Sequence, residues 1–382
     1  MKQSSVPAAV VIDLIEAALS ADYTAVRRVA GKMAHILDEQ KDADSAKSLR
    51  ALVRRRGVPL KASGYTEMLP VDLKSRLPLV EEQNDPTTPV FIDKKSESTV
   101  NSYVSDVKNV EALSSKGISA KLCLLLSGPP GTGKTLLAAH IAARLGRPLY
   151  VVRLDSVISS LLGDTAKNIR SVFEFVSVHK GILFLDEMDA IAKVRDDRQE
   201  LGELKRVVNT VIQGLDSLDD HSVVIAATNH SQLLDSAIWR RFPYKIELGL
   251  PCEDVREALW RYFLFEDDTK TTIPHVLSKI SSRLSGADIQ NLALAARRQA
   301  VLLKKPSIDT GAVAWAAVST SKGDFSLPPQ EGLTSEQKKT LSTILIKEFG
   351  ESNADIARLL GVTRQTVFGY QQGEENGIRK SA

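Results

Sequence analysis

The chain has 382 residues, 43% of them hydrophobic and 25% charged, which is the composition of a globular protein with at least one large core. That composition excludes a wholly disordered chain and a fibrous repeat, and the length favours about two to three domains. The formal net charge of +3 is too small for nucleic-acid binding by charge alone, although it permits such a partner.

The sequence lacks the features of a membrane protein. No apolar run approaches about 18 residues, the length that a membrane-spanning helix needs. Cys123 and Cys252 lie far apart and lack the spacing of metal ligands, so we expect both to be reduced. We therefore expect a cytoplasmic protein without membrane insertion.

The N-terminal part of the chain, residues 1–57, carries apolar residues at helical spacing in three short stretches. This pattern predicts a small helical bundle, which we interpret as a partner-docking domain. The bundle ends in Arg-Arg-Arg-Gly (residues 54–57), which is typical of a solvated helix end, with an acidic partner or nucleic acid as the alternative. Residues 58–89 are rich in Pro and Ser and lack periodicity, which indicates a linker.

Short apolar runs alternate with helical patterns across residues 90–250. Runs such as LCLLLS, LYVVRL, GILFLDE and SVVIAATN suit strands buried on both faces of a parallel sheet. The predicted fold class is therefore α/β, with a doubly wound parallel sheet. Residues 251–320 change to helical spacing and predict a helical lid. Residues 321–332 indicate a second linker, and residues 333–382 predict another small all-α domain.

The sequence GPPGTGKT, residues 128–135, lies between the apolar run LCLLLS and a helical pattern, which is the context of a P-loop. Its glycines let backbone N–H groups face phosphates, and the following helix adds its positive end. We expect Lys134 to bind the β- and γ-phosphates of ATP and the Thr135 hydroxyl to bind Mg²⁺. The predicted nucleotide-binding residues of this segment are Gly128, Pro129, Pro130, Gly131, Thr132, Gly133, Lys134, Thr135 and Leu136.

Two further apolar runs end in polar residues. Asp186 and Glu187 follow GILFL, which would place both at the carboxyl end of a strand beside the P-loop. We expect Asp186 to hold Mg²⁺ at the nucleotide through water and Glu187 to polarise the attacking water as general base, with a solvated pair of acids as the alternative. Asn229 ends SVVIAATN and would orient the water or sense the γ-phosphate, with the capping of a turn as its alternative.

These motifs, together with LLDSAIWRRFPYKIELGLP and SGADIQNLALAAR, resemble those of AAA-type (AAA+) ATPases over residues 90–320. The resemblance is to the meiotic/severing-like group, which also holds membrane-complex disassembly enzymes. It implies Mg²⁺-dependent ATP hydrolysis by a homo-oligomeric ring, expected to be a hexamer, in which arginines of the neighbouring subunit complete each site. Arg240 and Arg241 match the arginine-finger positions, although the commoner form of the motif separates them by Pro-Gly. Which of the two acts stays open, and solvated arginines after a helix are the alternative.

The resemblance also assigns a pore loop and a sensing region in the lid. Leu161, Leu162 and Gly163 stand where the first pore loop of the family lies, but unfoldase members carry an aromatic residue at the position of Leu161. An aliphatic side chain offers a threaded polypeptide less contact area than an aromatic ring. Packed helix residues are the alternative for this segment. Gly286 and Ala287 resemble the second sensing region, in which the lid approaches the nucleotide.

Near the C-terminus, Ala357, Gly361 and Val367 have the spacing of a helix-turn-helix module. Small Ala lets two helices approach, Gly makes the turn at positive φ, and Val anchors the second helix. A cap at the start of the second helix would leave the next side chains facing bases and phosphates. The predicted DNA contacts are Thr363, Arg364, Gln365, Thr366 and Tyr370. A helical module that docks a protein partner is the alternative.

These motifs together predict an ATP-hydrolysing AAA+ ring protein that remodels a protein or nucleoprotein target and is tethered to DNA by its C-terminal module. The alternative is an ATP-dependent switch that regulates DNA or a partner enzyme without threading a polypeptide. A protease in a bacterial defence or plasmid-maintenance pair would be one such partner, by analogy alone. The N-terminal bundle is similar in size and position to the adaptor domains of severing and membrane-disassembly enzymes.

Overall fold

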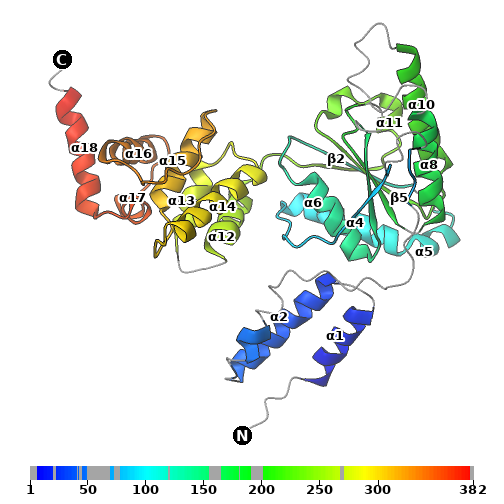
Figure 1. Ribbon diagram of the computed structural model, residues 1–382, viewed down its shortest axis with the longest axis horizontal. Coiled ribbons are helices and arrows are strands. Elements are labelled where there is room, and N and C mark those ends of the chain that lie inside the picture. The colour runs from blue at the N-terminus through cyan, green and yellow to red at the C-terminus, as the bar shows by residue number, and fades with distance from the viewer. Residues whose placement is uncertain are drawn as a thin grey trace. The chain divides into compact units, whose positions relative to one another are not determined.

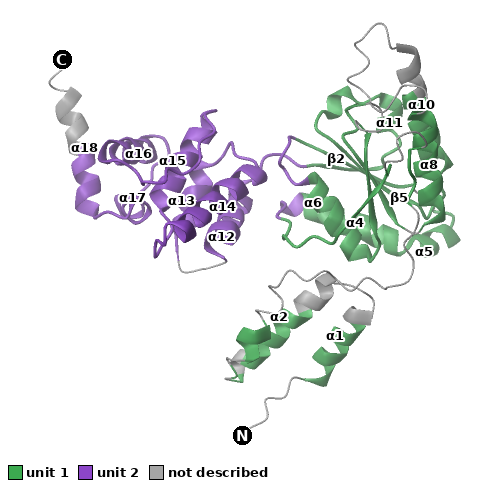
Figure 2. Cartoon of the chain, in the orientation of Figure 1, with its two compact units in different colours: residues 1–90, 96–128, 134–247 green, residues 91–95, 129–133, 248–382 purple. Residues whose placement is uncertain are grey.

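The computed structural model, drawn in Figure 1, divides into two compact units. Unit 1 comprises residues 1–90, 96–128 and 134–247, and unit 2 comprises residues 91–95, 129–133 and 248–382, as Figure 2 shows. The structure describes residues 7–19, 23–40, 42, 45–49, 69–72, 78–118, 121–154, 165–179, 181–190, 201–266 and 271–378.

Unit 1 is built on a six-stranded sheet with the strand order β1-β3-β4-β5-β2-β6. Strands β2 to β6 run parallel, and β1 pairs antiparallel with β3 at one edge. The predicted α/β class with a mostly parallel sheet is thus confirmed. The strands are β1 (Glu81–Gln83), β2 (Leu122–Ser127), β3 (Leu149–Arg153), β4 (Ile182–Asp186), β5 (Val223–Thr228) and β6 (Tyr244–Glu247).

Helices cover both faces of this sheet. Helices α8 and α10 pack on one face, and α4 and α6 lie on the other (Figure 1). Every residue of β2 and β5 is buried, which explains why their sequences are continuous apolar runs rather than alternating ones. The helices of this region are α4 (Lys94–Lys108), α5 (Val110–Ser115), α6 (Lys134–Leu145), α8 (Thr165–Val178), α10 (Leu201–Ser217), the 3₁₀ helix η2 (Ser231–Leu233) and α11 (Ser236–Trp239).

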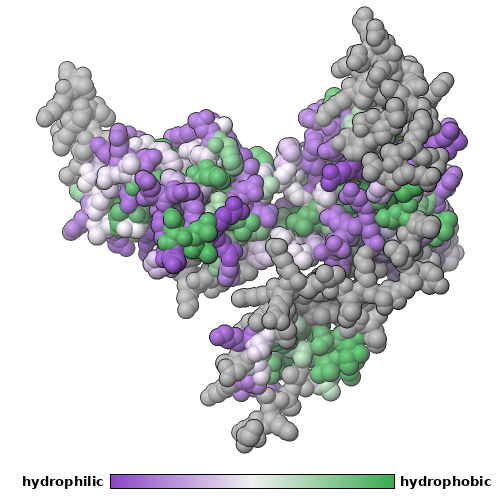
Figure 3. Space-filling model, viewed as in Figure 1, coloured by the Kyte–Doolittle hydropathy of each residue, from purple (hydrophilic) through white to green (hydrophobic). Residues whose placement is uncertain are grey.

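Two N-terminal helices pack against each other, and residues 45–49 are again helical. These helices are α1 (Ala8–Leu19) and α2 (Tyr23–Glu39). Helix α1 leaves Val11, Ile12 and Ile15 exposed, and hydrophobic surface gathers over it in Figure 3. An exposed apolar face of this kind suits the predicted docking role. Residues 54–57, the predicted arginine-rich helix end, lie outside the described residues.

Helices α12 to α18 surround one hydrophobic core in unit 2. Trp260 and Leu277 enter this core from the predicted lid, and Leu341 and Leu359 enter it from the chain after the predicted second linker. The lid and the C-terminal helices therefore bury each other's apolar side chains and shield them from water. The helices are α12 (Glu253–Phe265), α13 (Ile273–Ile280), α14 (Gly286–Leu302), α15 (Thr310–Ser321), α16 (Ser335–Lys347), α17 (Asn353–Leu360) and α18 (Arg364–Ile378). Among the described residues, no helix is long and apolar enough to cross a membrane.

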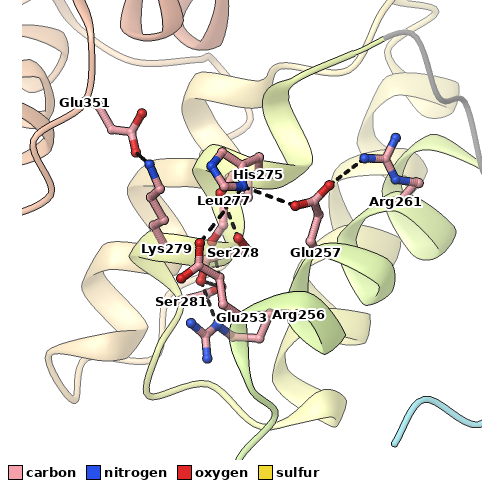
Figure 4. A network of polar contacts seen from close by, with 10 residues as sticks. All are labelled: Glu253, Arg256, Glu257, Arg261, His275, Leu277, Ser278, Lys279, Ser281 and Glu351. Atoms are coloured by element: carbon pink, nitrogen blue, oxygen red, sulfur yellow. Dashed lines mark hydrogen bonds and ion pairs between the residues drawn. The ribbon is translucent and has the colours of Figure 1, made fainter. Parts of the chain in front are cut away.

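Polar contacts also join the lid to the C-terminal helices. Lys279 Nζ on α13 lies 2.8 Å from Glu351 Oε1, in the loop before α17 (Figure 4). The Glu351 side chain is only 4% exposed, so the Lys279 ammonium compensates a carboxylate that would be costly to bury alone. Their hydrogen bond raises the pKa of Lys279 above its ordinary value. Nearby, the Thr310 hydroxyl donates to the Leu359 carbonyl at 2.6 Å.

Within the lid, a second set of contacts joins α12 to α13 (Figure 4). Glu257 on α12 accepts a 2.6 Å hydrogen bond from Arg261 and lies 3.1 Å from His275 Nδ1 on α13. Buried Arg256 donates through Nε to the Ser278 carbonyl at 2.6 Å. These contacts fix the two helices in the register that their shared core requires.

The chain turns sharply between α17 and α18. Helix α17 ends at Leu360 and is capped by Gly361, whose φ of 63° lies in the left-handed region that favours glycine. The Thr363 hydroxyl accepts a hydrogen bond from the Thr366 N–H at 3.2 Å, which caps the start of α18. Ala357 and Val367 are buried where the two helices meet. The geometry of the turn therefore follows from a glycine, a threonine cap and two buried anchors.

We expect the replacement Leu341→Ala to lower the free energy of unfolding by about 2–5 kcal/mol, because it removes a fully buried side chain from the shared core of unit 2. Leu327→Ala makes the same chemical change at a 55% exposed position and should cost less than about 0.5 kcal/mol. Urea unfolding followed by tryptophan fluorescence measures both, since Trp260 and Trp315 belong to this core. Equal losses in the two variants would contradict a shared core.

Candidate active site

Lys134, the first residue of α6, lies at the centre of the polar contacts of the P-loop. Its ammonium donates to the Gly128 carbonyl at 2.8 Å and to Asn229 Oδ1 at 2.7 Å. Lys134 is 8% exposed, and this burial lowers the pKa of its ammonium group, while the charges of Asp186 and Asp189 raise it. The predicted phosphate-binding lysine and the predicted sensing asparagine are thus in direct contact.

The two predicted magnesium ligands also meet. The Thr135 hydroxyl donates to Asp186 Oδ2 at 3.2 Å, and Asp186 Oδ1 accepts from the Glu187 N–H at 2.9 Å. Hydroxyl and carboxylate oxygens are the hard donors that Mg²⁺ binds in phosphate-handling sites. The donor set therefore fits the metal.

Glu187 adopts an unusual backbone conformation directly after β4. Its φ is 56°, in the left-handed region, where a residue other than glycine carries a cost of about 1–3 kcal/mol. Asp186 is half-buried and Glu187 is exposed, so the turn separates a carboxylate that faces Thr135 from one that is open to solvent. This separation suits the two different roles that the sequence predicts for the acids.

Asp189 is a site residue that the sequence analysis did not single out. It is 2% exposed, and its Oδ1 accepts hydrogen bonds from the Thr228 hydroxyl and from the Asn229 N–H, both at 3.2 Å. It thereby joins the turn after β4 to the end of β5, which carries Asn229. The sequence places Asp189 as the last acid of LDEMD, which could have marked it as a site residue. The sequence does not show which residues it contacts.

The predicted sensing region of the lid contacts the tip of the P-loop. The Ala287 N–H donates to the Gly131 carbonyl at 3.0 Å. Gly131 has a φ of 76°, and a Cβ built on it would lie 2.7 Å from Ser285 Oγ, so only glycine fits here. Ser285 itself caps α14 in a capping box with Asp288, which places Gly286 and Ala287 in the first turn. A chain that turns this tightly leaves the backbone N–H groups of the loop available for an anion.

The remaining predicted site residues lie elsewhere or are not described. Arg240 and Arg241 follow α11, and they differ in their contacts: Arg241 is paired with Asp216, whereas Arg240 is exposed. Leu161, Leu162 and Gly163, the predicted pore loop, lie outside the described residues. The predicted DNA contacts lie together at the start of α18, where Thr363, Arg364 and Gln365 are exposed and Thr366 and Tyr370 are half-buried.

A P-loop at the carboxyl ends of a parallel sheet, with an acid pair at the carboxyl end of a second strand of that sheet, defines a nucleoside triphosphatase domain. Residues 124–250 match, more narrowly, the family described as "ATPase family associated with various cellular activities (AAA)". The chain therefore contains an AAA ATPase domain, and this family implies the use of ATP and Mg²⁺.

Three curated proteins illustrate the likeness. The chain is 39% identical over 216 residues to an AAA family ATPase of Sinorhizobium fredii, 34% over 204 residues to 26S proteasome regulatory subunit 6A of Saccharomyces cerevisiae, and 35% over 195 residues to a proteasome-activating nucleotidase of Sulfurisphaera tokodaii. These matches cover 53%, 50% and 49% of this chain, and 64%, 47% and 50% of the three relatives. The chain thus spans less than two thirds of each relative.

These relatives refine the family assignment made from the motifs. Two of the three names refer to proteasomes, none refers to a severing enzyme, and none refers to DNA. The likeness is therefore established for AAA ATPases in general rather than for the meiotic/severing-like group.

Asp189→Ala should lower the turnover number for ATP by about 10²-fold, the effect of a misplaced catalytic group, and should change ATP affinity little. Asn229 would lose the acceptor that fixes its backbone, while Lys134 and the P-loop stay intact. Asp189→Asn keeps an acceptor oxygen and should retain most of the activity. Asp219→Ala is the control, since Asp219 caps a surface turn through Ser222. Steady-state kinetics in which Asp189→Ala behaves like this control would contradict the positioning role.

Proposed function

We propose that this chain is an Mg²⁺-dependent ATP hydrolase that assembles into a ring and remodels a protein target. The observation that carries the proposal is the contact of Lys134 with Asn229 beside the contact of Thr135 with Asp186. Together these contacts bring a cation, a neutral polar group and two oxygen donors to one edge of the sheet, where a P-loop binds phosphates.

Each residue of this group has a distinct task in hydrolysis. The Lys134 ammonium exchanges the Gly128 and Asn229 oxygens for phosphate oxygens and neutralises their charge. Asn229 is then released to orient the attacking water. The Glu187 carboxylate takes a proton from that water as its oxygen bonds to the γ-phosphorus, and the bond from the γ-phosphorus to the bridging oxygen breaks to release ADP. Thr135 and Asp186 would hold Mg²⁺, which when bound neutralises charge on the phosphate oxygens.

The names of the relatives support a protein target. Two of these relatives are named as a proteasome-activating nucleotidase and a 26S proteasome regulatory subunit, so both names refer to the proteasome. We therefore favour remodelling of the unfoldase kind over severing. In this proposal the ring is a homo-hexamer, arginines of a neighbouring subunit complete each site, and Leu161, Leu162 and Gly163 line the pore.

The C-terminal helices support a tether to DNA as a further part of the proposal. Gly361 and the Thr363 cap set α17 and α18 in a tight turn, and Arg364 and Gln365 are exposed on the first turn of α18. Arg and Gln at the start of a second helix are the side chains that contact base edges in helix-turn-helix proteins. The N-terminal helices, with the exposed apolar face of α1, would select the protein partner.

Glu187→Gln should leave ATP binding intact and slow hydrolysis by about 10²- to 10⁴-fold, the contribution of a positioned general base. Glu247→Gln makes the same change at the carboxyl end of β6, an edge strand of the same sheet, and should leave the rate unchanged. Lys134→Ala should instead weaken ATP binding. A phosphate-release assay and a fluorescent-nucleotide titration separate the two effects. Wild-type turnover by Glu187→Gln would show that Glu187 is not the base. If the base is confirmed, the Glu187→Gln ring held with ATP is also suited to capturing the protein target.

Arg364→Ala and Gln365→Ala should each weaken binding of the ATP-assembled protein to a selected duplex by about 1–3 kcal/mol, if these side chains contact base edges. A loss that is equal on all duplexes would indicate phosphate contacts. Arg283→Ala, which removes an exposed arginine of the lid, is the matched control. Fluorescence anisotropy at two salt concentrations measures the affinities. Failure of the wild-type ring to bind any duplex at low salt would leave α16 to α18 as a protein-docking module.

A further inference from the structure

The carboxylate of Glu351 is oriented by the end of helix α16. Gly350, directly before it, has a φ of 66°, and its N–H donates to the Ile346 carbonyl at 3.1 Å. A glycine in this conformation ends a helix and turns the chain sharply. The Glu351 N–H also donates to the Leu345 carbonyl at 3.0 Å. The backbone therefore fixes the place of Glu351, whose side chain is only 4% exposed and lies against Lys279 on α13 (Figure 4).

Lys279 lies in the last turn of α13, a few residues before the start of α14. The chain between these two helices is fixed by Ser281, which is fully buried. Its hydroxyl accepts a hydrogen bond from Trp260 Nε1 at 3.0 Å, and its carbonyl accepts one from the Leu284 N–H at 3.0 Å. Ser285 then caps α14. The end of α13 and the first turn of α14 are thus joined by a short, hydrogen-bonded segment.

The first turn of α14 contacts residues 129–133, the tip of the P-loop, within unit 2. Besides the hydrogen bond from the Ala287 N–H to the Gly131 carbonyl at 3.0 Å, the packing is close: a Cβ built on Gly131 would lie 2.7 Å from Ser285 Oγ and 3.1 Å from the Ala287 Cβ. At such distances a shift of α14 either displaces the loop or breaks the hydrogen bond. The place of the P-loop tip therefore depends on that of α13 and α14.

We infer that Glu351 and Lys279 are positioning residues of the nucleotide site, and that the C-terminal helices are a functional part of the ATPase lid. Their ion pair holds the end of α13, and through it the first turn of α14, against the tip of the P-loop. This inference rests on the proposed function, in which the loop binds the phosphates of ATP. The consequence is a reciprocal coupling: a partner that shifts α16 or α17 changes the affinity for ATP, and bound ATP changes the affinity for that partner by the same factor.

The first experiment follows hydrogen exchange of the Ala287 N–H by mass spectrometry, in the full-length protein without nucleotide. Glu351→Gln removes the charge and keeps the shape of the side chain, and Lys279, whose side chain is 33% exposed, stays solvated. This variant should speed exchange at Ala287 by about 2- to 30-fold, the range for residues that couple two sites. Exchange in the buried middle of α15 should stay unchanged. Lys279→Arg keeps the ion pair and should keep the protection of Ala287.

Glu348→Gln is the matched control for this experiment. It makes the same change at the end of α16, where the Glu348 side chain is 50% exposed and its Oε1 lies 3.5 Å from Lys322 Nζ. It should leave exchange at Ala287 unchanged, because an exposed ion pair contributes little. Wild-type exchange at Ala287 in Glu351→Gln, or faster exchange throughout unit 2, would overturn the inference.

The second experiment is steady-state ATP turnover by the same variants. Glu351→Gln should raise the KM for ATP by about 2- to 30-fold and leave kcat nearly unchanged, because the P-loop binds the phosphates both before and during the reaction. Glu348→Gln should change neither constant. A lowered kcat at unchanged KM would contradict the positioning role. Wild-type protein without ATPase activity would refute the proposed function, while the exchange experiment would still decide whether the ion pair holds the P-loop tip.

Discussion

The parallel pairing of β4, β5 and β2 determines where the residues of the candidate site lie. Ser127 on β2 is in register with Thr228 on β5, so the P-loop and Asn229 leave the sheet at the same edge. Strand β4 pairs with the other side of β5 and brings Asp186 to that edge as well. Contacts between residues 95 and 51 positions apart, Lys134 with Asn229 and Thr135 with Asp186, are therefore consequences of strand order.

The sequence predicted those parts of the fold and site that depend on local constraints. Continuous apolar runs predicted the buried parallel strands, and the P-loop pattern predicted Gly131, whose backbone has a positive φ. The approach of the lid to Gly131 was not predicted. Asp189 and Asp216 escaped prediction because their roles depend on partners that are distant in sequence. Nothing in the residues around Asp216 distinguishes an acid paired with Arg241 from a solvated one.

The domain organisation of the C-terminal part could not be predicted either, because it depends on contacts between residues that are distant in sequence. The prolines and glycines of residues 321–332 predict a linker, and this segment has little regular secondary structure. Gln299 on α14 nevertheless donates to the Pro328 carbonyl at 2.7 Å, and Lys305 donates to the Gln330 carbonyl at 3.1 Å. Prolines and glycines exclude a helix but do not prevent packing against one. Helical periodicity likewise revealed that α16 and α17 have apolar faces, but not that the lid covers them.

The shared core also constrains how unit 2 can act. The tip of the P-loop belongs to this unit, because Gly131 contacts Ser285 and Ala287 at the start of α14. Helix α14 in turn packs around the core that contains Leu341 and Leu359. Detaching α16 to α18 from the lid would expose these buried leucines and leave Glu351 without the Lys279 ammonium. The surface that we propose to meet DNA is therefore connected, through packed side chains, to the residues that contact the phosphate-binding loop. Moving this surface relative to those residues would carry a large cost in free energy.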